Sequence, residues 1–258
     1  MKSIYQHFRY SERPFIDRAL GWKKLAEERH QIKLTDFLNP REQKIVQALI
    51  GKNDDCEVRF YGGYNEAERK RAIIFPSYLE PSKDDFSIAL FEVDYPNKFV
   101  ELEHRHLLGA LLSLGLKREK FGDILKTESK LQFITGLELD AYLPMNLNEV
   151  GKYKVKLKKV FTDELNIPKT EWDEKGVTVS SLRLDVVLSS IYNLSRQKAQ
   201  AYIKAGKVKV NWTETEEVNI EVEENDMLSI RGLGRSKITE LNGKTKNGKV
   251  KMVVGLLK

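Results

Sequence analysis

The spacing of apolar residues predicts two amphipathic helices at the N-terminal end of the chain. Apolar positions recur every three or four residues from Pro14 to Ala26, as one face of a helix requires. A second stripe follows Asn39, a residue type that caps helix N-termini, and Pro40 fits the first helical position because an N–H would have no partner there. The chain is therefore expected to be mainly helical as far as Gly51.

Beyond Gly51 the apolar period changes from helical to strand-like. Residues 56–61 and 72–75 predict short strands, bounded by Gly62-Gly63 and by Pro76. Further along, the predicted elements follow in the order strand (86–93), helix (102–114), strand (121–125), strand (131–135), helix (137–147), strand (153–160). This βαββαβ order is that of the ferredoxin-like fold, which RNA-recognition modules share with many enzymes and metabolite sensors.

The aromatic residues of this central region do not decide between those uses. The run of Lys or Arg, Gly and Phe with which RNA-recognition modules stack bases is not visible in the sequence. Phe86 and Phe91 on the first predicted strand and Phe133 on the third are expected to lie in the core. The function of the central region stays open at this point.

The apolar pattern near the C-terminus predicts a unit of helix, turn, helix and strand. Apolar residues between 184 and 191 stand at i, i+3, i+4 and i+7, which gives one helix with a narrow apolar stripe. Ser195 then suits the N-cap of a second helix, and Gly206 suits its end. Residues 208–210 alternate as a short strand that leads to Asn211.

Two further stretches complete the predicted organisation. Residues 162–181 are polar, contain Pro168 and Gly176 and lack a long apolar period, so they predict a linker, whereas residues 238–241 and 250–256 predict a final hairpin. The predicted fold class is α+β. It comprises a helical N-terminal domain with short strands (1–84), a ferredoxin-like domain (85–161), the linker (162–181) and a C-terminal helix-turn-helix plus β domain (182–258).

Charge is concentrated in the last of these domains. The 258 residues carry a net charge of +6, and residues 182–258 hold about 14 Lys and Arg against about 9 Asp and Glu. Between residues 195 and 210 every charged residue is basic: Arg196, Lys198, Lys204, Lys207 and Lys209. Because clustered cations attract phosphate backbones, this stretch predicts contact with a polyanion.

The start of the second C-terminal helix suits a phosphate group. A helix N-terminus presents unpaired N–H groups, so Ser195 and Arg196 together predict a phosphate seat. Arg183 would lie nearby if the two helices pack antiparallel. Asp185 is interpreted as a partner that orients or caps these basic groups, and not as a catalyst.

The C-terminal pattern resembles a known RNA-binding family. Arg183-Leu184-Asp185, Ser195-Arg196, the stretch from Ala199 to Asn211, and Arg231-Gly232 with Gly234-Arg235 are similar to the domain named after small-subunit ribosomal protein four, here called the S-four domain. The resemblance implies binding of folded ribosomal or transfer RNA. The contact residues it implies are Arg183, Ser195, Arg196, Lys198, Lys204, Lys207 and Lys209, with Arg231 and Arg235 at the rim.

Nearly the whole chain resembles a narrower family. The opening IYQHFRYSERPFIDRALGW, the stretches KLTDFLNPRE and FYGGYNEAERKRAIIFP, and the S-four domain together are similar to the bacterial YlmH family. That resemblance implies a central RNA-recognition-like fold, a link to the cell-division gene neighbourhood, and rescue of stalled ribosomes. The partners it implies are ribosomal RNA, transfer RNA and the large ribosomal subunit.

Other functional classes are weighed against RNA binding. Pseudouridine synthases use an Asp in a motif that Arg183-Leu184-Asp185 superficially fits, but here the triplet opens the S-four helix itself. A protein-binding adaptor of the division machinery is the third hypothesis. We expect no cofactor and no catalytic or metal site: Gly62-Gly63 predicts a simple turn, and His104 and His106, two apart on a helix, point in different directions.

The expected location is the cytoplasm, without membrane insertion. Charged residues interrupt every apolar run near the N-terminus, so no signal core is visible. The single cysteine, Cys56, excludes an internal disulfide and is expected to be a buried small residue.

Overall fold

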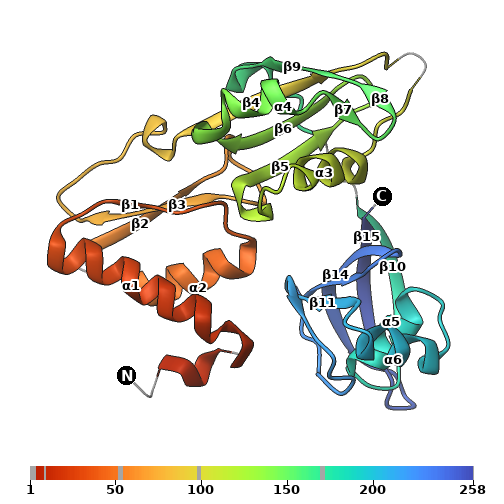
Figure 1. Cartoon of the computed structure of the whole chain (residues 1–258). Coiled ribbons are helices and arrows are strands. Elements are labelled where there is room, and N and C mark those ends of the chain that lie inside the picture. The colour runs from red at the N-terminus through yellow and green to blue at the C-terminus, as the bar shows by residue number, and fades with distance from the viewer. Residues whose placement is uncertain (1–3, 9, 52–54, 98–99, 169–171, 258) are drawn as a thin grey trace. The chain divides into compact units, whose positions relative to one another are not determined.

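The computed structural model describes residues 4–8, 10–51, 55–97, 100–168 and 172–257. The chain divides into two compact units, residues 1–168 and residues 169–258, and each is described by itself (Figure 1). Helices and sheets both contribute to the structure, which confirms the predicted α+β class. Within the described ranges, no helix combines the length and apolar character that crossing a membrane requires.

The N-terminal part of the first unit packs two helices on one face of a small sheet. Asn39 caps the second helix as predicted, because its side chain accepts hydrogen bonds from the backbone N–H groups of Arg41 and Glu42. The sheet has the strand order β1-β3-β2. The elements are η1 (Ile4–His7), η2 (Tyr10–Glu12), α1 (Arg13–Arg29), β1 (Lys33–Leu34), α2 (Pro40–Ile50), β2 (Cys56–Tyr61) and β3 (Arg71–Pro76).

The remainder of the first unit forms an antiparallel sheet of order β5-β6-β4-β9 with α3 and α4 beside it, in the predicted βαββαβ sequence (Figure 1). Its helices are η3 (Asp84–Phe86), α3 (His104–Ser113), η4 (Arg118–Lys120), η5 (Leu137–Leu139), α4 (Tyr142–Asn146) and η6 (Thr162–Glu164). Its strands are β4 (Ile88–Asp94), β5 (Phe121–Lys126), β6 (Leu131–Gly136), β7 (Glu149–Val150), β8 (Tyr153–Lys154) and β9 (Lys156–Lys159).

One predicted helix of this region is wrong as a continuous element. Residues 137–147 form the short helices η5 and α4 instead of one helix. Pro144 gives the physical reason, because in a continuous helix its ring would clash with the carbonyl group of Asp140, four residues earlier. The chain therefore restarts the helix at Tyr142, which places the proline within the first turn.

The second unit is a six-stranded sheet of order β10-β15-β14-β13-β11-β12, covered by α5 and α6 (Figure 1). Its core joins apolar residues of both helices to those of the sheet. The predicted helices, the short strand and the final hairpin are all present. The elements are β10 (Trp172–Val179), α5 (Leu184–Ile191), α6 (Arg196–Lys204), β11 (Val208–Val210), β12 (Thr213–Glu214), β13 (Met227–Ile230), β14 (Gly234–Lys244) and β15 (Val250–Leu257).

The prediction that residues 162–181 form a linker is wrong for their second half. Residues 172–179 are the strand β10, which pairs antiparallel with β15 along its whole length. Only Val177 and Val179 of β10 are buried, because the strand lies at the edge of the sheet and exposes most of its side chains. Because most of its residues are polar, β10 has no apolar alternation from which a strand could be predicted.

Candidate nucleic-acid interface

The first group of predicted site residues surrounds a buried carboxylate, Asp185, in the first turn of α5. The Oδ1 atom of Asp185 accepts a hydrogen bond from Arg183 Nε at 3.2 Å. Its Oδ2 atom accepts hydrogen bonds from Arg196 Nε at 2.8 Å and from Gln200 Nε2 at 2.7 Å. The packing of α5 against α6 thus brings both arginines to one carboxylate, which confirms the interpretation of Asp185 as an orienting partner.

The charge state of Asp185 follows from these contacts. Burial by itself raises the pKa of the carboxyl group, but the hydrogen bonds from Gln200, Arg196 and Arg183 outweigh it and lower the pKa to about 2. The side chain of Asp185 is 0% exposed, whereas those of Arg183 and Arg196 are 37% and 55% exposed. Each arginine uses its Nε–H on Asp185, which leaves the terminal N–H groups for an external anion such as phosphate.

The N-terminus of α6 is built as predicted. The Ser195 Oγ atom accepts a hydrogen bond from the backbone N–H of Lys198 at 3.2 Å, and the serine proton is left for another acceptor. Lys198 and Lys204 are exposed, and in the described part of the chain neither forms an ion pair. The helix therefore presents unpaired cations and a positive dipole end to solvent.

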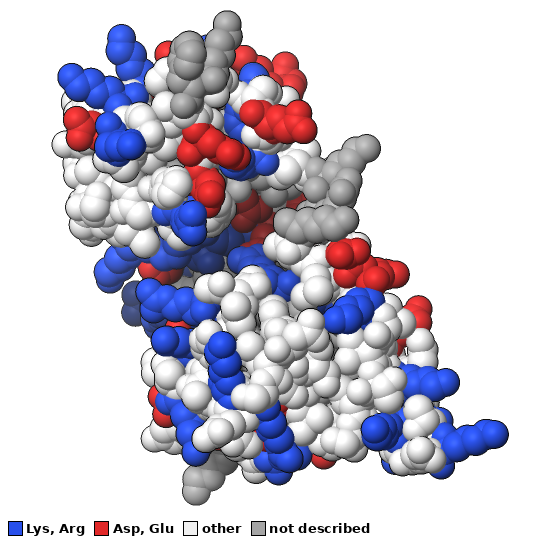
Figure 2. Space-filling view, turned by 90° about the vertical axis from the view of Figure 1, so that its right-hand side faces the viewer, with Lys and Arg blue, Asp and Glu red and all other residues white. Residues whose placement is uncertain are grey.

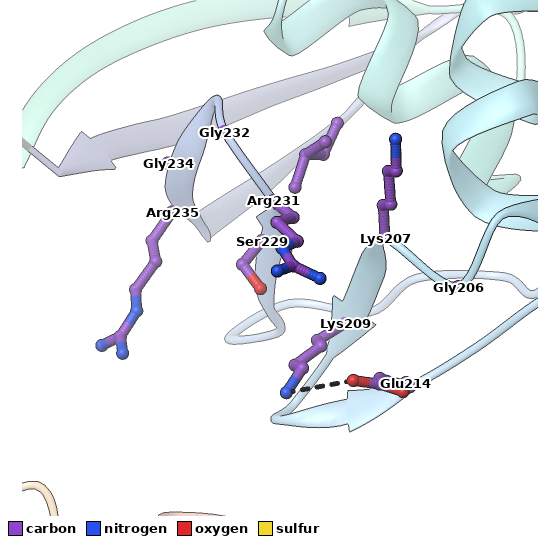
Figure 3. A pocket seen from close by; sticks show the side chains of 10 residues that line it. Gly206, Lys207, Lys209, Glu214, Ser229, Arg231, Gly232, Gly234 and Arg235 are labelled. Carbon is purple, nitrogen blue, oxygen red and sulfur yellow. Dashed lines mark ion pairs between the residues drawn. The ribbon is translucent and has the colours of Figure 1, made fainter. Parts of the chain in front are cut away.

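A second group of predicted residues lines a shallow pocket of about 390 Å³ on the sheet (Figure 3). Lys207 immediately precedes β11 and Lys209 lies within it, whereas Arg231 follows β13 and Arg235 belongs to β14. Figure 3 shows the Arg231 side chain extending toward the side of the pocket where Lys209 lies, while Arg235 extends away from Lys207. The remaining lining residues are Gly206, Glu214, Ser229, Ile230, Gly232 and Gly234.

The pairing of β11 with β13 fixes this pocket. Arg231 donates its backbone N–H to the Lys207 carbonyl oxygen at 2.8 Å, directly beyond the last pair of the ladder. Lys209 Nζ forms an ion pair with Glu214 Oε1 at 3.4 Å, and both side chains are exposed. Lys207 Nζ lies 5.9 Å from the centroid of the Tyr202 ring. The nine predicted residues thus form two groups in the structure. The helical group is Arg183, Ser195, Arg196, Lys198 and Lys204, and the pocket group is Lys207, Lys209, Arg231 and Arg235.

Acidic residues of the second unit gather in a different segment from its basic residues. Between residues 214 and 226 the chain has seven acidic residues and no Lys or Arg: Glu214, Glu216, Glu217, Glu221, Glu223, Glu224 and Asp226. In the lower foreground of Figure 2, Lys and Arg predominate over Asp and Glu on the visible face of this unit. A polyanion would be attracted to the basic side and repelled by the acidic segment.

The central sheet offers no comparable face. On one side Phe91 and Phe133 stack at 5.5 Å between ring centroids beneath α3 and α4, which confirms their predicted core role. On the other side Leu90 and Ile134 are buried against Phe37 from the N-terminal part. The sheet surface on which RNA-recognition modules stack bases is therefore occupied by the first unit's own residues.

The glycine pair that precedes Tyr64 belongs to this packing. Gly63 has a φ of +94°, and a Cβ atom at this position would lie 3.2 Å from Ile134 Cδ1 and 3.3 Å from Leu90 Cδ2. Glycine is required because the backbone approaches the central sheet so closely. The loop is a packing turn, as predicted, and not a cradle for phosphate.

Two histidines, His104 and His106, lie close together in the sequence of the first unit. His104 and His106 lie in the first turn of α3, and His106 Nδ1 accepts a hydrogen bond from the Glu103 backbone N–H at 3.2 Å. This contact gives His106 a capping role at the start of α3. Across the described ranges, no three His, Cys, Asp or Glu side chains come together as a metal site.

Sequence reasoning missed two residues of the second unit. Gln200 completes the Asp185 network, and its position four residues after Arg196 on the same helix was the signal that could have revealed it. Trp212 lies in the two-residue loop between β11 and β12 and has a positive φ of 65°. An aromatic residue in a position that favours glycine was the signal there.

Comparison with known families matches most of the chain. The description "YlmH, N-terminal" matches residues 11–79, and "Putative RNA-binding domain in YlmH" matches residues 81–164. The description "S4 domain" matches residues 182–228, which contain the helical group and the start of the pocket. The predicted S-four domain is thereby confirmed.

Individual relatives agree with these matches. The Bacillus subtilis (strain 168) protein named Ribosome-associated protein quality control protein P2 is 49% identical over 249 residues, which cover 96% of each chain. The solved structure of the cell division protein ylmH from Streptococcus pneumoniae is 32% identical, with a TM-score of 0.54, and covers 63% of this chain and 99% of its own. From these similarities and the residues that the sequence already indicated, we conclude that the chain belongs to the YlmH family.

Proposed function

We propose that this chain is a non-enzymatic RNA-binding protein that acts in ribosome-associated quality control. The single observation that carries the proposal is the buried Asp185 carboxylate, which holds Arg183 and Arg196 in place while their guanidinium groups remain partly exposed. Such preorganised cations bind phosphate without first losing side-chain freedom. The name of the Bacillus subtilis relative supports the setting, the ribosome.

The proposed target is structured ribosomal RNA or a transfer RNA bound to the large ribosomal subunit, in the cytoplasm. The cations of the helical group and the pocket group are suited to phosphate oxygens, which position a protein but carry no sequence information. Recognition by shape and charge is typical of proteins that bind folded RNA. We therefore propose binding of an RNA surface rather than the reading of a base sequence.

Catalysis by Asp185 is disfavoured by its surroundings. A pseudouridine-synthase-like aspartate must reach its substrate, but the Asp185 side chain is fully buried. Its oxygens already accept hydrogen bonds from Arg183, Arg196, Gln200 and the backbone N–H of Val186. These contacts support an orienting role within a binding surface.

Cosedimentation with purified ribosomal subunits tests the proposal. The wild-type protein is expected to sediment with the large subunit at low salt, and Arg183→Ala/Arg196→Ala is expected to bind at least tenfold more weakly. Arg105→Ala is the matched control, because Arg105 is an exposed arginine of the first unit. Its binding should equal that of the wild type.

Truncation of the two arginines also perturbs Asp185, so a second variant separates binding from folding. Lys198→Gln/Lys204→Gln removes two exposed cations of α6 that do not contact Asp185. It should keep the wild-type unfolding temperature and still bind more weakly. Wild-type sedimentation of both double variants would refute the site. Association with division proteins that survives nuclease treatment, without binding to ribosomal subunits, would favour the adaptor hypothesis.

A further inference from the structure

Four lysines gather at the tip of the hairpin that β14 and β15 form (Figure 1). They are Lys244, Lys246, Lys249 and Lys251, here called the hairpin lysines, and they belong to neither the helical group nor the pocket group. All four are exposed, and among the described residues none of them forms an ion pair. From residue 241 to residue 258 the sequence contains no Asp or Glu, so the tip carries concentrated positive charge.

Backbone hydrogen bonds hold the tip in shape without using the lysine side chains. The Gly248 N–H donates to the Thr245 carbonyl oxygen at 2.9 Å, and the Thr245 N–H donates to the Lys249 carbonyl oxygen at 2.7 Å. The Lys249 N–H donates to Thr245 Oγ1 at 3.1 Å. Gly248 has a φ of 75°, which glycine adopts without strain. The turn is therefore ordered in advance, while the ammonium groups remain available for an anion.

A β-bulge at the base of the hairpin separates this tip from the rest of the sheet. The register shifts so that two residues of β14 lie opposite Lys251 alone. Such a bulge bends the strand and changes the direction of the side chains beyond it. Two carboxylates contact the same base: Glu224 Oε2 accepts from the Leu241 backbone N–H at 3.1 Å, and Glu240 Oε2 accepts from Asn242 Nδ2 at 3.0 Å. These acidic residues bond to the base of the hairpin and leave its tip to the lysines.

The strand pairing places the tip at the same end of the sheet as the start of α5. Val179, the last residue of β10, pairs with Val250, the first residue of β15. Arg183 follows Val179 by four residues, which span at most about 14 Å. Lys244 pairs with Val250, whose side chain packs against the core beneath the helices, so Lys244 lies on the helical side of the sheet. The hairpin lysines therefore lie near the helical group, whereas Arg235 of the pocket group lies at the opposite end of β14.

Protection of a sheet edge does not account for these lysines. Lysine side chains on edge strands prevent pairing with other sheets. Lys251 lies on β15, however, and this strand has β10 on one side and β14 on the other. Lys246 lies in the turn beyond the last paired residues of the two strands. A cluster of cations that neither an edge nor an ion pair explains is suited to binding a polyanion.

We propose that the hairpin lysines bind phosphates of the same RNA that the helical group binds, so that the β14–β15 hairpin is an arm of the RNA-binding surface. This inference rests on the proposed RNA-binding function and deepens it, because the hairpin lies outside residues 182–228, which the S4 domain description matches. Lysine ammonium groups act as point charges, which suit a phosphate backbone and do not read bases. The ligand of the arm is therefore the backbone of a folded RNA.

The first test measures the affinity of the full chain for a ribosomal RNA stem-loop over a salt series. Lys246→Gln/Lys249→Gln should bind about tenfold more weakly than the wild type, and the slope of log affinity against log salt should fall by about two. Lys246→Arg/Lys249→Arg keeps both charges and should bind like the wild type. The control Lys24→Gln/Lys44→Gln removes the same charge from exposed positions of α1 and α2 and should change the affinity less than about twofold. All variants should keep the wild-type unfolding temperature, and an equal loss of affinity in the control would overturn the arm.

A crosslinking measurement locates the contact independently of affinity. The single native cysteine, Cys56, is 0% exposed, so a thiol-reactive photo-crosslinker should label an introduced surface cysteine selectively. Labelled Asn247→Cys, at the tip of the hairpin, should crosslink to the stem-loop. Labelled Asp173→Cys, which lies at the far end of β10 and is exposed, should not. Absence of a crosslink from position 247, or equal crosslinking from both positions, would overturn the assignment.

The helical group distinguishes this inference from the function on which it rests. If Arg183→Ala/Arg196→Ala binds the stem-loop more weakly while Lys246→Gln/Lys249→Gln binds like the wild type, the arm is refuted and the RNA-binding surface of the helices stands. If neither variant alters binding, the proposed function fails and the arm fails with it. Weaker binding by both, with a crosslink from the tip, supports one continuous surface.

Discussion

Each unit of the molecule contains an aspartate with several hydrogen-bond donors: Asp123 is half-buried and Asp185 is fully buried, and the two differ in what those donors are. Asp123 in the first unit accepts from the Tyr64 hydroxyl at 2.8 Å and from the backbone N–H groups of Glu68 and Arg69 at 2.7 and 3.0 Å. Asp185 in the second unit accepts from two partly exposed arginine side chains, and also from Gln200 and the Val186 backbone N–H. The donors to Asp123 come from the segment between β2 and β3, so their hydrogen bonds join that segment to the central sheet. The arginine donors to Asp185 are partly exposed at the protein surface.

The pKa values of the two carboxyl groups reflect this difference. Burial raises the pKa of Asp123, although the hydrogen bonds from Tyr64, Glu68 and Arg69 act in the opposite direction. For Asp185 the donors prevail over burial and lower the pKa to about 2. The carboxylate with internal donors joins parts of the fold, whereas the carboxylate with partly exposed arginine donors holds cations at the surface, where we propose that RNA binds.

Asp123→Ala should produce the largest loss of stability. The substitution leaves the Tyr64 hydroxyl and two backbone N–H groups without an acceptor in a half-buried loop, at about 1–3 kcal/mol for each unsatisfied donor. The free energy of unfolding should fall by roughly 3 kcal/mol or more in denaturant titration. The RNA affinity of the folded variant should equal that of the wild type. If the folded variant binds RNA more weakly, the first unit also contributes to RNA binding.

Asp185→Asn should affect both stability and binding. It removes the charge that positions Arg183 and Arg196, which should lower the free energy of unfolding by roughly 2 kcal/mol and weaken RNA binding about tenfold. Denaturant titration and RNA titration of the same preparation measure the two effects. A variant with reduced stability but wild-type affinity would show that the arginines do not need this carboxylate in order to bind RNA.

The stability of the protein should depend on pH through Asp185. Because the folded-state pKa of Asp185 is lowered to about 2, its contribution is fully present above the unfolded value near 4 and is lost as the pH falls toward 2. The contribution amounts to about 2 kcal/mol. Wild type and Asp185→Asn should therefore converge in stability between pH 4 and pH 2, and a constant difference over that range would contradict the lowered pKa.

Glu214→Gln should have the smallest effect. The ion pair with Lys209 is exposed, and surface pairs contribute about 0–1 kcal/mol, so the unfolding temperature should hardly change. RNA affinity should rise about twofold because the pocket loses its acidic residue and Lys209 is released for phosphate. Weaker binding of this variant would indicate that the ion pair positions Lys209.

The sequence predicted the Asp185 site well because its parts are local. Arg183, Asp185, Ser195 and Arg196 lie on two consecutive helices whose apolar stripes fix their faces, so charge and capping patterns were sufficient. The RNA-contact role of these residues stays a prediction. The partner Gln200 was missed because an amide on a helix resembles ordinary surface composition.

The Asp123 contacts could not be predicted in this way. Tyr64 lies 59 residues from Asp123, and no periodicity connects a loop to a strand of a different sheet. The covering of the central sheet by Phe37 depends on the same long-range packing. Likewise the sequence pattern predicts a linker where β10 forms, because this exposed edge strand has no apolar alternation.

The salt dependence of RNA affinity shows directly whether Arg183 and Arg196 contact phosphate. The affinity for a structured ribosomal RNA fragment would be measured over a salt series for the wild type and for Arg183→Ala/Arg196→Ala. We expect the slope of log affinity against log salt to fall by about two, near one for each lost phosphate contact. An unchanged slope would show that the arginines held by Asp185 do not contact phosphate.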